Sequence, residues 1–239
     1  MTEQAQSITA QQIRTALAAG LGRLNGAGVP SASLAAELLL MHVIERDRTW
    51  LYAHPEQELS TEQAATYTGL LEARAAGTPV QYLTGRQEFW GLDFEVTPAV
   101  LIPRPETEHL IEVTLERLGA RRGERLVVAD VGTGSGCIAV ALARELPQAR
   151  FVATDISAEA LEVARRNAAR HGVSHRVDFL EADLLNVLNV RATNAGKDLR
   201  FPAETMAGEP KLQATPSAGF SLPKVISLAA VLIRPASDT

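Results

Sequence analysis

The first part of the chain spaces its apolar residues as amphipathic helices do. Apolar positions recur every three or four residues up to Leu24, and the same spacing resumes after Pro30. A third segment opens at Ser60, and Gln63 follows three residues later, which is the pattern of a capping box. We therefore expect a small helical domain over residues 1–78.

The pattern changes over residues 79–108. Phenylalanine, tryptophan and valine residues cluster on both sides of Gly91. Aromatic and β-branched residues around a glycine are typical of two strands joined by a tight turn. This stretch is therefore predicted to form a β-hairpin and a linker.

Short apolar runs alternate with helical segments from Arg125 onward. The expected elements are strands at 126–131, 150–154 and 177–180 and helices at 136–146 and 157–171. Apolar runs of this length suit strands that are buried on both faces. Strand–helix alternation predicts an α/β fold with a doubly wound, Rossmann-like parallel sheet, of which residues 109–186 would form the first half.

The periodic pattern stops after Asn186. Residues 187–239 hold five of the twelve prolines and show no sustained spacing of apolar residues. Half a sheet would leave strand edges uncovered, which favours aggregation or proteolysis. We therefore expect residues 187–239 to form an atypical, disordered tail.

The composition narrows the choice of partners and compartment. The 239 residues are 46% hydrophobic and 21% charged, with a net charge of −5, which argues against nucleic acid as a direct partner. The single cysteine, Cys137, suits a reduced cytoplasm. The N-terminus lacks the pattern of a signal peptide, and the longest apolar run, 225–233, is too short to cross a bilayer, so no membrane partner is expected.

The strongest chemical signal is a glycine-rich motif between a predicted strand and a predicted helix. Its candidate ligand-binding residues are Asp130, Gly132, Thr133, Gly134, Ser135 and Gly136. The third glycine comes one residue earlier than in the dinucleotide fingerprint, which argues against a dehydrogenase. The motif resembles the loop of class I methyltransferases that binds S-adenosylmethionine (SAM). A glycine-rich turn without a ligand is the alternative.

Asp155 is the second candidate cofactor residue. It ends the second predicted strand, 23 residues after Gly132. A carboxylate at this place can accept hydrogen bonds from two ribose hydroxyls, as its counterpart in dinucleotide-binding folds does. Alternatively, Asp155 only favours the start of the next helix through the helix dipole.

Other catalytic chemistry has little support. None of the five histidines stands at a metal-ligand spacing, so no metal is expected. No arrangement typical of a Ser-His-Asp triad is recognisable in the sequence.

A resemblance to a family rests on three further motifs. They read Gln81-Tyr-Leu-Thr-Gly85, Glu88-Phe-Trp-Gly91 and Leu101-Ile-Pro-Arg-Pro-Glu-Thr-Glu108. Together they resemble the signature of release-factor glutamine methyltransferases, which methylate a glutamine side chain in class I peptide chain release factors. The resemblance covers residues 8–185 and includes the helical domain, the hairpin and the SAM-binding half in that order.

The resemblance implies a cofactor, a partner and further site residues. The cofactor is SAM, and the partner is a class I release factor recognised by the helical domain. Asp183 and Leu184 would border the adenine. Arg104, Glu106 and Thr107 would lie near the cofactor, although proline-stiffened structure and a surface ion pair explain them equally well.

The family's catalytic motif is missing. In these enzymes Asn-Pro-Pro-Tyr holds the substrate amide, through its asparagine oxygen and a backbone carbonyl, but this sequence contains no Pro-Pro pair. No catalytic residue is therefore assigned. The alternatives are an inactive, truncated or frame-shifted product that at most binds SAM, and an amino-methyltransferase acting on nucleic acid.

Overall fold

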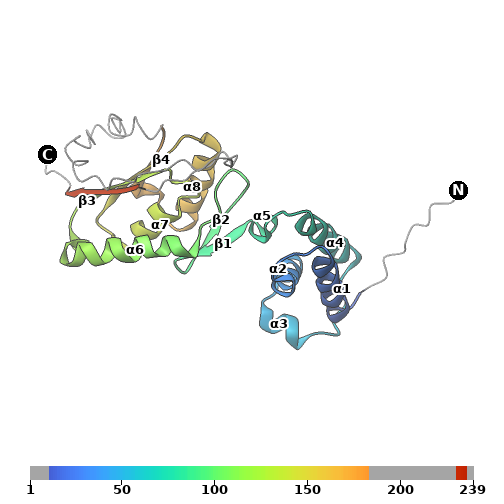
Figure 1. Ribbon diagram of the computed structural model, residues 1–239. Helices are drawn as coiled ribbons and strands as arrows, with labels where there is room; N and C mark the ends of the chain where they lie inside the picture. The colour runs from blue at the N-terminus through green and yellow to red at the C-terminus, as the bar shows by residue number, and fades with distance from the viewer. Residues whose placement is uncertain (1–10, 183–229, 236–239) are drawn as a thin grey trace. The chain divides into compact units, whose positions relative to one another are not determined.

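The chain divides into two compact units, Met1–Gly85 and Arg86–Thr239, in a computed structural model that describes residues 11–182 and 230–235 (Figure 1). The first unit extends past residue 78, where the helical domain was expected to end. The reason is α5 (Val80–Thr84), a helix absent from the prediction. Two of its side chains, Val80 and Leu83, pack on the helical core, so the boundary falls after this helix.

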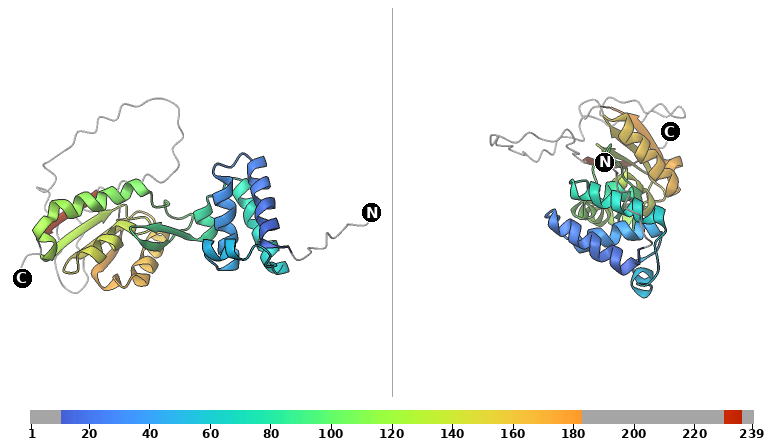
Figure 2. Two further views of the ribbon diagram at one scale, coloured as in Figure 1. Left: turned by 90° about the horizontal axis from the view of Figure 1, so that it is seen from below. Right: turned by 90° about the vertical axis from the view of Figure 1, so that its right-hand side faces the viewer.

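Helices of this unit form at the three places where the sequence predicted helical segments, before Pro30, after Pro30 and from Ser60. Its other helices are α1 (Ile13–Gly26), α2 (Ala32–Ile44), α3 (Arg48–Ala53) and α4 (Thr61–Ala75). Helices α1, α2 and α4, coloured blue to teal in Figure 2, pack against one another around buried Leu24, Leu39 and Leu40. The capping box of α4 is confirmed, because the backbone N–H of Gln63 donates to Ser60 Oγ (3.1 Å) and that of Ser60 donates to Gln63 Oε1 (2.9 Å).

The predicted hairpin is also present. Strands β1 (Arg86–Phe89) and β2 (Leu92–Glu95) pair antiparallel. Trp90 and Gly91 form the two-residue turn between them and have φ angles of 55° and 67°. Positive φ at both positions is the conformation that matches the twist of paired strands.

The second unit contains the predicted parallel sheet. Its strands are β3 (Leu126–Val131), β4 (Arg150–Asp155), β5 (Val177–Glu181) and β6 (Ala230–Pro235), in the order β5-β4-β3-β6. Its helices are α6 (Pro105–Leu118), α7 (Cys137–Glu145) and α8 (Ala158–Arg170), and short 3₁₀ turns occupy 119–123 and 174–176. Strands β3, β4 and β5 are parallel, as expected for strands joined by helical crossovers. The left view of Figure 2 shows all three helices on one face of the sheet.

The core of this unit lies between the sheet and those helices. Every residue of β3 is buried, as is every residue of α7 from Cys137 to Ala143. Phe89 and Phe94 of the hairpin join the same cluster, with their ring centroids 6.1 Å apart in an edge-to-face contact. The hairpin is therefore part of the second unit's core and not a free linker.

Strand β6 corrects the expectation of a disordered tail over residues 187–239. It pairs antiparallel with β3, from Val131 opposite Ala230 to Leu126 opposite Pro235. An open edge of β3 would leave backbone groups unpaired, and β6, which contains the β-branched residues Val231 and Ile233, supplies a partner for them. The rest of the expected tail, 187–229 and 236–239, lies outside the described residues.

Two negative findings apply to the described part of the chain. None of its helices is both long and apolar enough to span a membrane. Over the same residues, no three histidine, cysteine or acidic side chains are grouped so that they could hold a metal ion.

Candidate functional site

The glycine-rich loop joins the carboxyl end of β3 to the start of α7. Gly132, Gly134 and Gly136 have φ angles of 74°, 53° and 80°, which L-residues with a side chain rarely adopt. A Cβ on Gly136 would lie 3.0 Å from the Cβ of Ala164 in α8, whereas a Cβ on Gly134 would meet nothing within 4 Å. The loop therefore presses on α8 at Gly136 and has open space at Gly134.

The end of β4 holds this loop in place. The carbonyl oxygen of Thr154 accepts hydrogen bonds from the backbone N–H groups of Gly132 and Thr133, both at 2.8 Å. The Asp155 carboxylate accepts from the N–H of Gly134 at 2.9 Å and from that of Ser157 at 3.0 Å. The two parts of the predicted cofactor site, the loop and Asp155, are therefore in direct contact.

Asp130 anchors the loop from beneath. It is fully buried, and its Oδ2 accepts hydrogen bonds from Thr133 Oγ1 (2.7 Å) and from the N–H of Ala139 (3.1 Å). Burial raises the pKa of Asp130 to about 6, although these two hydrogen bonds oppose the rise. Its Oδ1 has no hydrogen-bond donor in the described part of the chain, so this buried acceptor has capacity for one more donor.

Cys137, the first residue of α7, is not a reactive thiol. Burial is the main cause that raises its pKa to about 12, and the charge of Asp130 adds to the effect. The thiolate is the nucleophilic form of cysteine, so the raised pKa disfavours nucleophilic chemistry at this side chain, which packs in the core.

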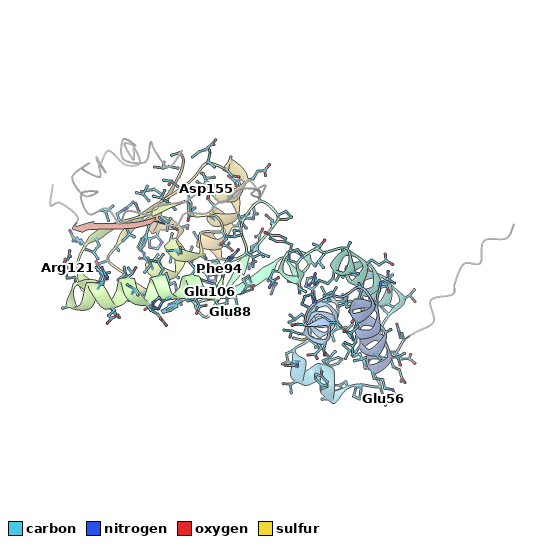
Figure 3. The ribbon with its side chains drawn as sticks, in the orientation of Figure 1. Glu56, Glu88, Phe94, Glu106, Arg121 and Asp155 are labelled. Carbon is cyan, nitrogen blue, oxygen red and sulfur yellow. The ribbon has the colours of Figure 1, made fainter. Side chains whose placement is uncertain are left out.

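The three weaker candidates lie at the start of α6. Arg104 is the N-cap residue of that helix, and its carbonyl oxygen accepts from the N–H of Thr107 at 2.9 Å. Glu106 stands in the first turn, and Figure 3 places it toward the hairpin and apart from Asp155. These observations support a structural role at a helix start, while the role beside a cofactor stays a prediction.

Neighbouring motif residues hold the hairpin turn. Glu108 Oε1 accepts from the N–H of Trp90 at 2.9 Å, and Glu88 Oε1 accepts from the N–H of Gly91 at 2.6 Å. The indole N–H of Trp90 donates to Glu145 Oε1 at 2.9 Å. The motifs around Glu88 and Glu108 therefore meet in space, and each carboxylate satisfies a backbone donor of the turn.

Two predicted adenine-site residues are not described by the structure, and one buried residue beside the loop was not predicted. Asp183 and Leu184 lie outside the described residues. Asn167 of α8, which the sequence analysis did not single out, is fully buried and donates to the carbonyl oxygen of Ser135 in the loop at 2.9 Å. The available signal was a polar residue on the otherwise apolar helix face that includes Ala160 and Ala164.

Known proteins match both units of the chain. A model of the PrmC N-terminal domain matches residues 15–85, and a model of a methyltransferase domain matches residues 128–197. The release factor glutamine methyltransferase of Chlorobaculum tepidum is 41% identical over 214 residues, which cover 82% of this chain and 73% of that protein. The chain belongs to the release factor glutamine methyltransferase family. The resemblance noted in the sequence is thereby confirmed.

The chain spans only part of the length of the relatives that it matches. The release factor glutamine methyltransferase of Koribacter versatilis is 50% identical over 176 residues, which are 74% of this chain but 61% of that protein. The chain thus matches about three fifths of that relative's length. A crystal structure of an RNA methyltransferase from Salinibacter ruber in complex with S-adenosyl-L-homocysteine is 32% identical and covers 36% of this chain and 54% of its own, with a TM-score of 0.31.

Proposed function

We propose that the second unit binds SAM in the loop from Gly132 to Gly136. The observation that carries this proposal is the contact between Asp155 and the loop, where Gly134 N–H donates to the carboxylate at 2.9 Å. This contact lies at the carboxyl ends of parallel strands, which is where ligands bind in open α/β sheets. The methyltransferase-domain match over 128–197 supports the same ligand.

Each polar group of the site has a distinct part in this proposal. Asp155 is half-buried and can accept hydrogen bonds from the ribose hydroxyls in addition to those it receives from backbone N–H groups. The open space at Gly134 lets the backbone approach the cofactor. Asp130 Oδ1, which has no donor among the described residues, suits the positively charged amino group of SAM, either directly or through a water molecule.

We propose methyl transfer to a glutamine side chain of a class I release factor as the reaction that this cofactor serves. When bound, SAM supplies a methyl group activated by its sulfonium centre. A glutamine amide nitrogen is a poor nucleophile, because its lone pair is delocalised into the carbonyl group. The chain's task is therefore to fix the cofactor so that the methyl group and the nitrogen can lie in line.

Binding of SAM without transfer is the second candidate function. It is favoured by one observation, the absence of Asn-Pro-Pro-Tyr from the sequence. Without groups that take up the amide hydrogens, the charge that develops on the amide during transfer is not stabilised. A transfer assay separates the two candidates.

The helical unit is the part that we propose recognises the protein substrate, in the cytoplasm. The match of residues 15–85 to the PrmC N-terminal domain supports this division of labour. The unit also offers a cavity of about 260 Å³ with apolar walls that include Leu17 and Leu51. Glu37 lines the cavity and is 4% exposed; it accepts from Tyr52 Oη at 2.8 Å and pairs with Arg48 at 2.9 Å.

Calorimetric titration of the full chain with SAM tests the binding proposal. Asp155→Ala should weaken binding by roughly 1–3 kcal/mol, or about fivefold to 150-fold, because polar groups of the ligand lose their partner. The matched control is Asp178→Ala in β5, an acidic residue that pairs with Arg150 and not with the loop. No heat from the wild-type chain near millimolar concentrations would overturn the binding proposal.

Transfer of a radiolabelled methyl group from SAM to a class I release factor tests the reaction. The control substrate is the same release factor with its acceptor glutamine changed to alanine. Label that depends on the glutamine supports the methyltransferase proposal. Binding of SAM with no transfer under the same conditions supports the second candidate.

A further inference from the structure

Asn167 makes three hydrogen bonds from the interior of the second unit. Its Oδ1 accepts from the backbone N–H of Glu95 at 2.8 Å, and its Nδ2 donates to the carbonyl oxygen of Glu95 at 3.0 Å. The same Nδ2 donates to the carbonyl oxygen of Ser135 at 2.9 Å. One side chain of α8 therefore bonds to the last residue of β2 and to the glycine-rich loop at once.

The orientation of this amide follows from its partners. The Glu95 N–H requires an acceptor, and the two carbonyl oxygens require donors, so only one placement of the amide oxygen and nitrogen satisfies all three. Asn167 is 0% exposed and Ser135 is 2% exposed. Because water has little access to these groups, the loss of the amide would leave backbone groups without partners.

Helix α8 supports the loop at a second point on the same face. Ala164 lies one helical turn before Asn167 and would meet a Cβ on Gly136 at 3.0 Å. The loop thus rests on the backbone and Cβ of Ala164 and is bonded by Asn167. Both contacts fix the part of the loop that leads into α7.

Arg166, the neighbour of Asn167, contacts the same strand in a different way. Its guanidinium group donates to both carboxylate oxygens of Glu95, with distances of 2.7 to 3.1 Å. This ion pair is half-exposed and lowers the pKa of Glu95. It joins α8 to β2 as Asn167 does, but its partner is the side chain of Glu95, not the loop.

We propose that Asn167 is a positioning residue that couples the hairpin strand β2 to the cofactor loop, so that the loop holds its SAM-binding shape only while the hairpin is docked. This inference rests on the proposed SAM binding. It assigns no contact between Asn167 and the cofactor. Asn167 acts through Ser135 and Glu95.

Three variants of the full chain separate positioning from general stability. Asn167→Ala removes all three hydrogen bonds, and Arg166→Ala removes the ion pair to the same strand. Val173→Ala is a core control: Val173 is buried and precedes the amino end of β5, whereas the loop lies at the carboxyl ends of β3 and β4. We expect Asn167→Ala to weaken SAM binding by about tenfold, as expected when buried polar partners are lost, and each control to change it less than about threefold.

Amide exchange measured without SAM supplies the second readout. The N–H groups of Gly134 and Gly136 are bonded within the site, to Asp155 and to Thr133, whereas the amide of Val152 lies in β4 in the centre of the sheet. In Asn167→Ala, the two loop amides should exchange at least about tenfold faster while Val152 keeps its protection, because opening is local. Equal acceleration at all three amides in a folded variant would show a purely structural role and overturn the proposal.

A second substitution keeps the proposal testable if Asn167→Ala does not fold. Asn167→Asp keeps the shape and the acceptor for Glu95 N–H but loses both donations, so it should show the same selective loss. If the loss of SAM affinity in the Asn167 variants is no larger than in Val173→Ala at the same loss of melting temperature, the proposal is overturned. If the wild-type chain binds no SAM, the function fails, but the exchange experiment still decides whether Asn167 holds the loop.

Discussion

Two turns of the second unit, the hairpin turn and the glycine-rich loop, both contain glycine and contact acidic residues but differ in their roles. In the hairpin turn, Trp90 and Gly91 have positive φ angles, and their N–H groups donate to Glu108 and Glu88. Each carboxylate thus serves the fold itself. A motif can therefore stand out in a sequence because it holds a turn, without any contact to a ligand.

The glycine-rich loop after β3 differs in what it leaves free. Asp130 Oδ1 is buried without a donor among the described residues, and the space beside Gly134 is open. Asp155 is only half-buried at the same place. The buried acceptor of Asp130, which has no donor among the described residues, separates this loop from the hairpin turn. Open space alone does not, because a Cβ on Gly91 would also meet nothing within 4 Å. Substitutions can test the comparison in order of expected effect.

The largest effect is expected where the loop touches α8. Gly136→Ala should lower the free energy of unfolding by about 3 kcal/mol, because the new Cβ meets Ala164 and the residue must hold a left-handed conformation. Gly134→Ala has the conformational cost without the contact and should lose about 1 kcal/mol. Urea unfolding measures both values.

In SAM binding the order of the two variants should be reversed, with the larger loss of affinity in Gly134→Ala and the smaller in Gly136→Ala. Gly134→Ala fills the open space and should weaken binding, as measured by calorimetry on variants that remain folded. Equal losses of stability in the two variants would contradict the tight contact at Gly136. Unchanged binding in Gly134→Ala would contradict the assignment of that space to the cofactor.

A smaller, pH-dependent effect is expected at Asp130. Its pKa is about 6 in the folded chain, above the ordinary aspartate value of 3.8, so the folded state holds the proton more tightly. The stability that this group contributes is therefore fully present below about pH 4 and is lost between about pH 4 and 6. The total loss is at most about 3 kcal/mol, and the contribution stays low at higher pH. The free energy of unfolding should fall with pH over this range in the wild type but not in Asp130→Asn. Parallel plots of unfolding free energy against pH for the two proteins would contradict the raised pKa.

The smallest effect is expected at the hairpin turn. Glu108→Ala should cost about 1–2 kcal/mol of stability, because the N–H of Trp90 loses its acceptor. Glu108→Gln keeps an oxygen at that place and should cost less. SAM affinity should be unchanged in both, and a tenfold loss in Glu108→Ala would show that the two turns do not have separate roles.

The sequence predicted the elements that local patterns determine. The strand at 126–131 was placed at its observed bounds, and Ser157 caps α8 by accepting from the N–H of Ala160 at 3.1 Å. The loop and Asp155 were chosen from the glycine motif, its strand–helix context and the position of Asp155, and the structure brings them into contact, while their role in cofactor binding stays a prediction. The strand and the cap were predicted correctly because capping side chains and apolar runs act over a few residues.

Features that depend on distant partners were missed. Strand β6 needs the edge of β3 as a partner, and the apolar run 225–233, which overlaps its first four residues, was considered only as a membrane span. The role of Asn167 depends on Glu95, 72 positions away, and on Ser135, 32 positions away. No local rule contains such pairs, since their free energy comes from burial in the folded state.

The antiparallel pairing of β6 with β3 has a consequence for biosynthesis. The two strands pair Val131 with Ala230 and Leu126 with Pro235, so the partner of Leu126 is translated 109 residues later (235 − 126). At a synthesis rate of about 5–20 residues per second, one edge of β3 stays without its β6 partner for roughly 5–20 seconds. During that interval β3 can pair with β4 but not with β6, so a nascent chain is most exposed to wrong pairing at this edge before β6 leaves the ribosome.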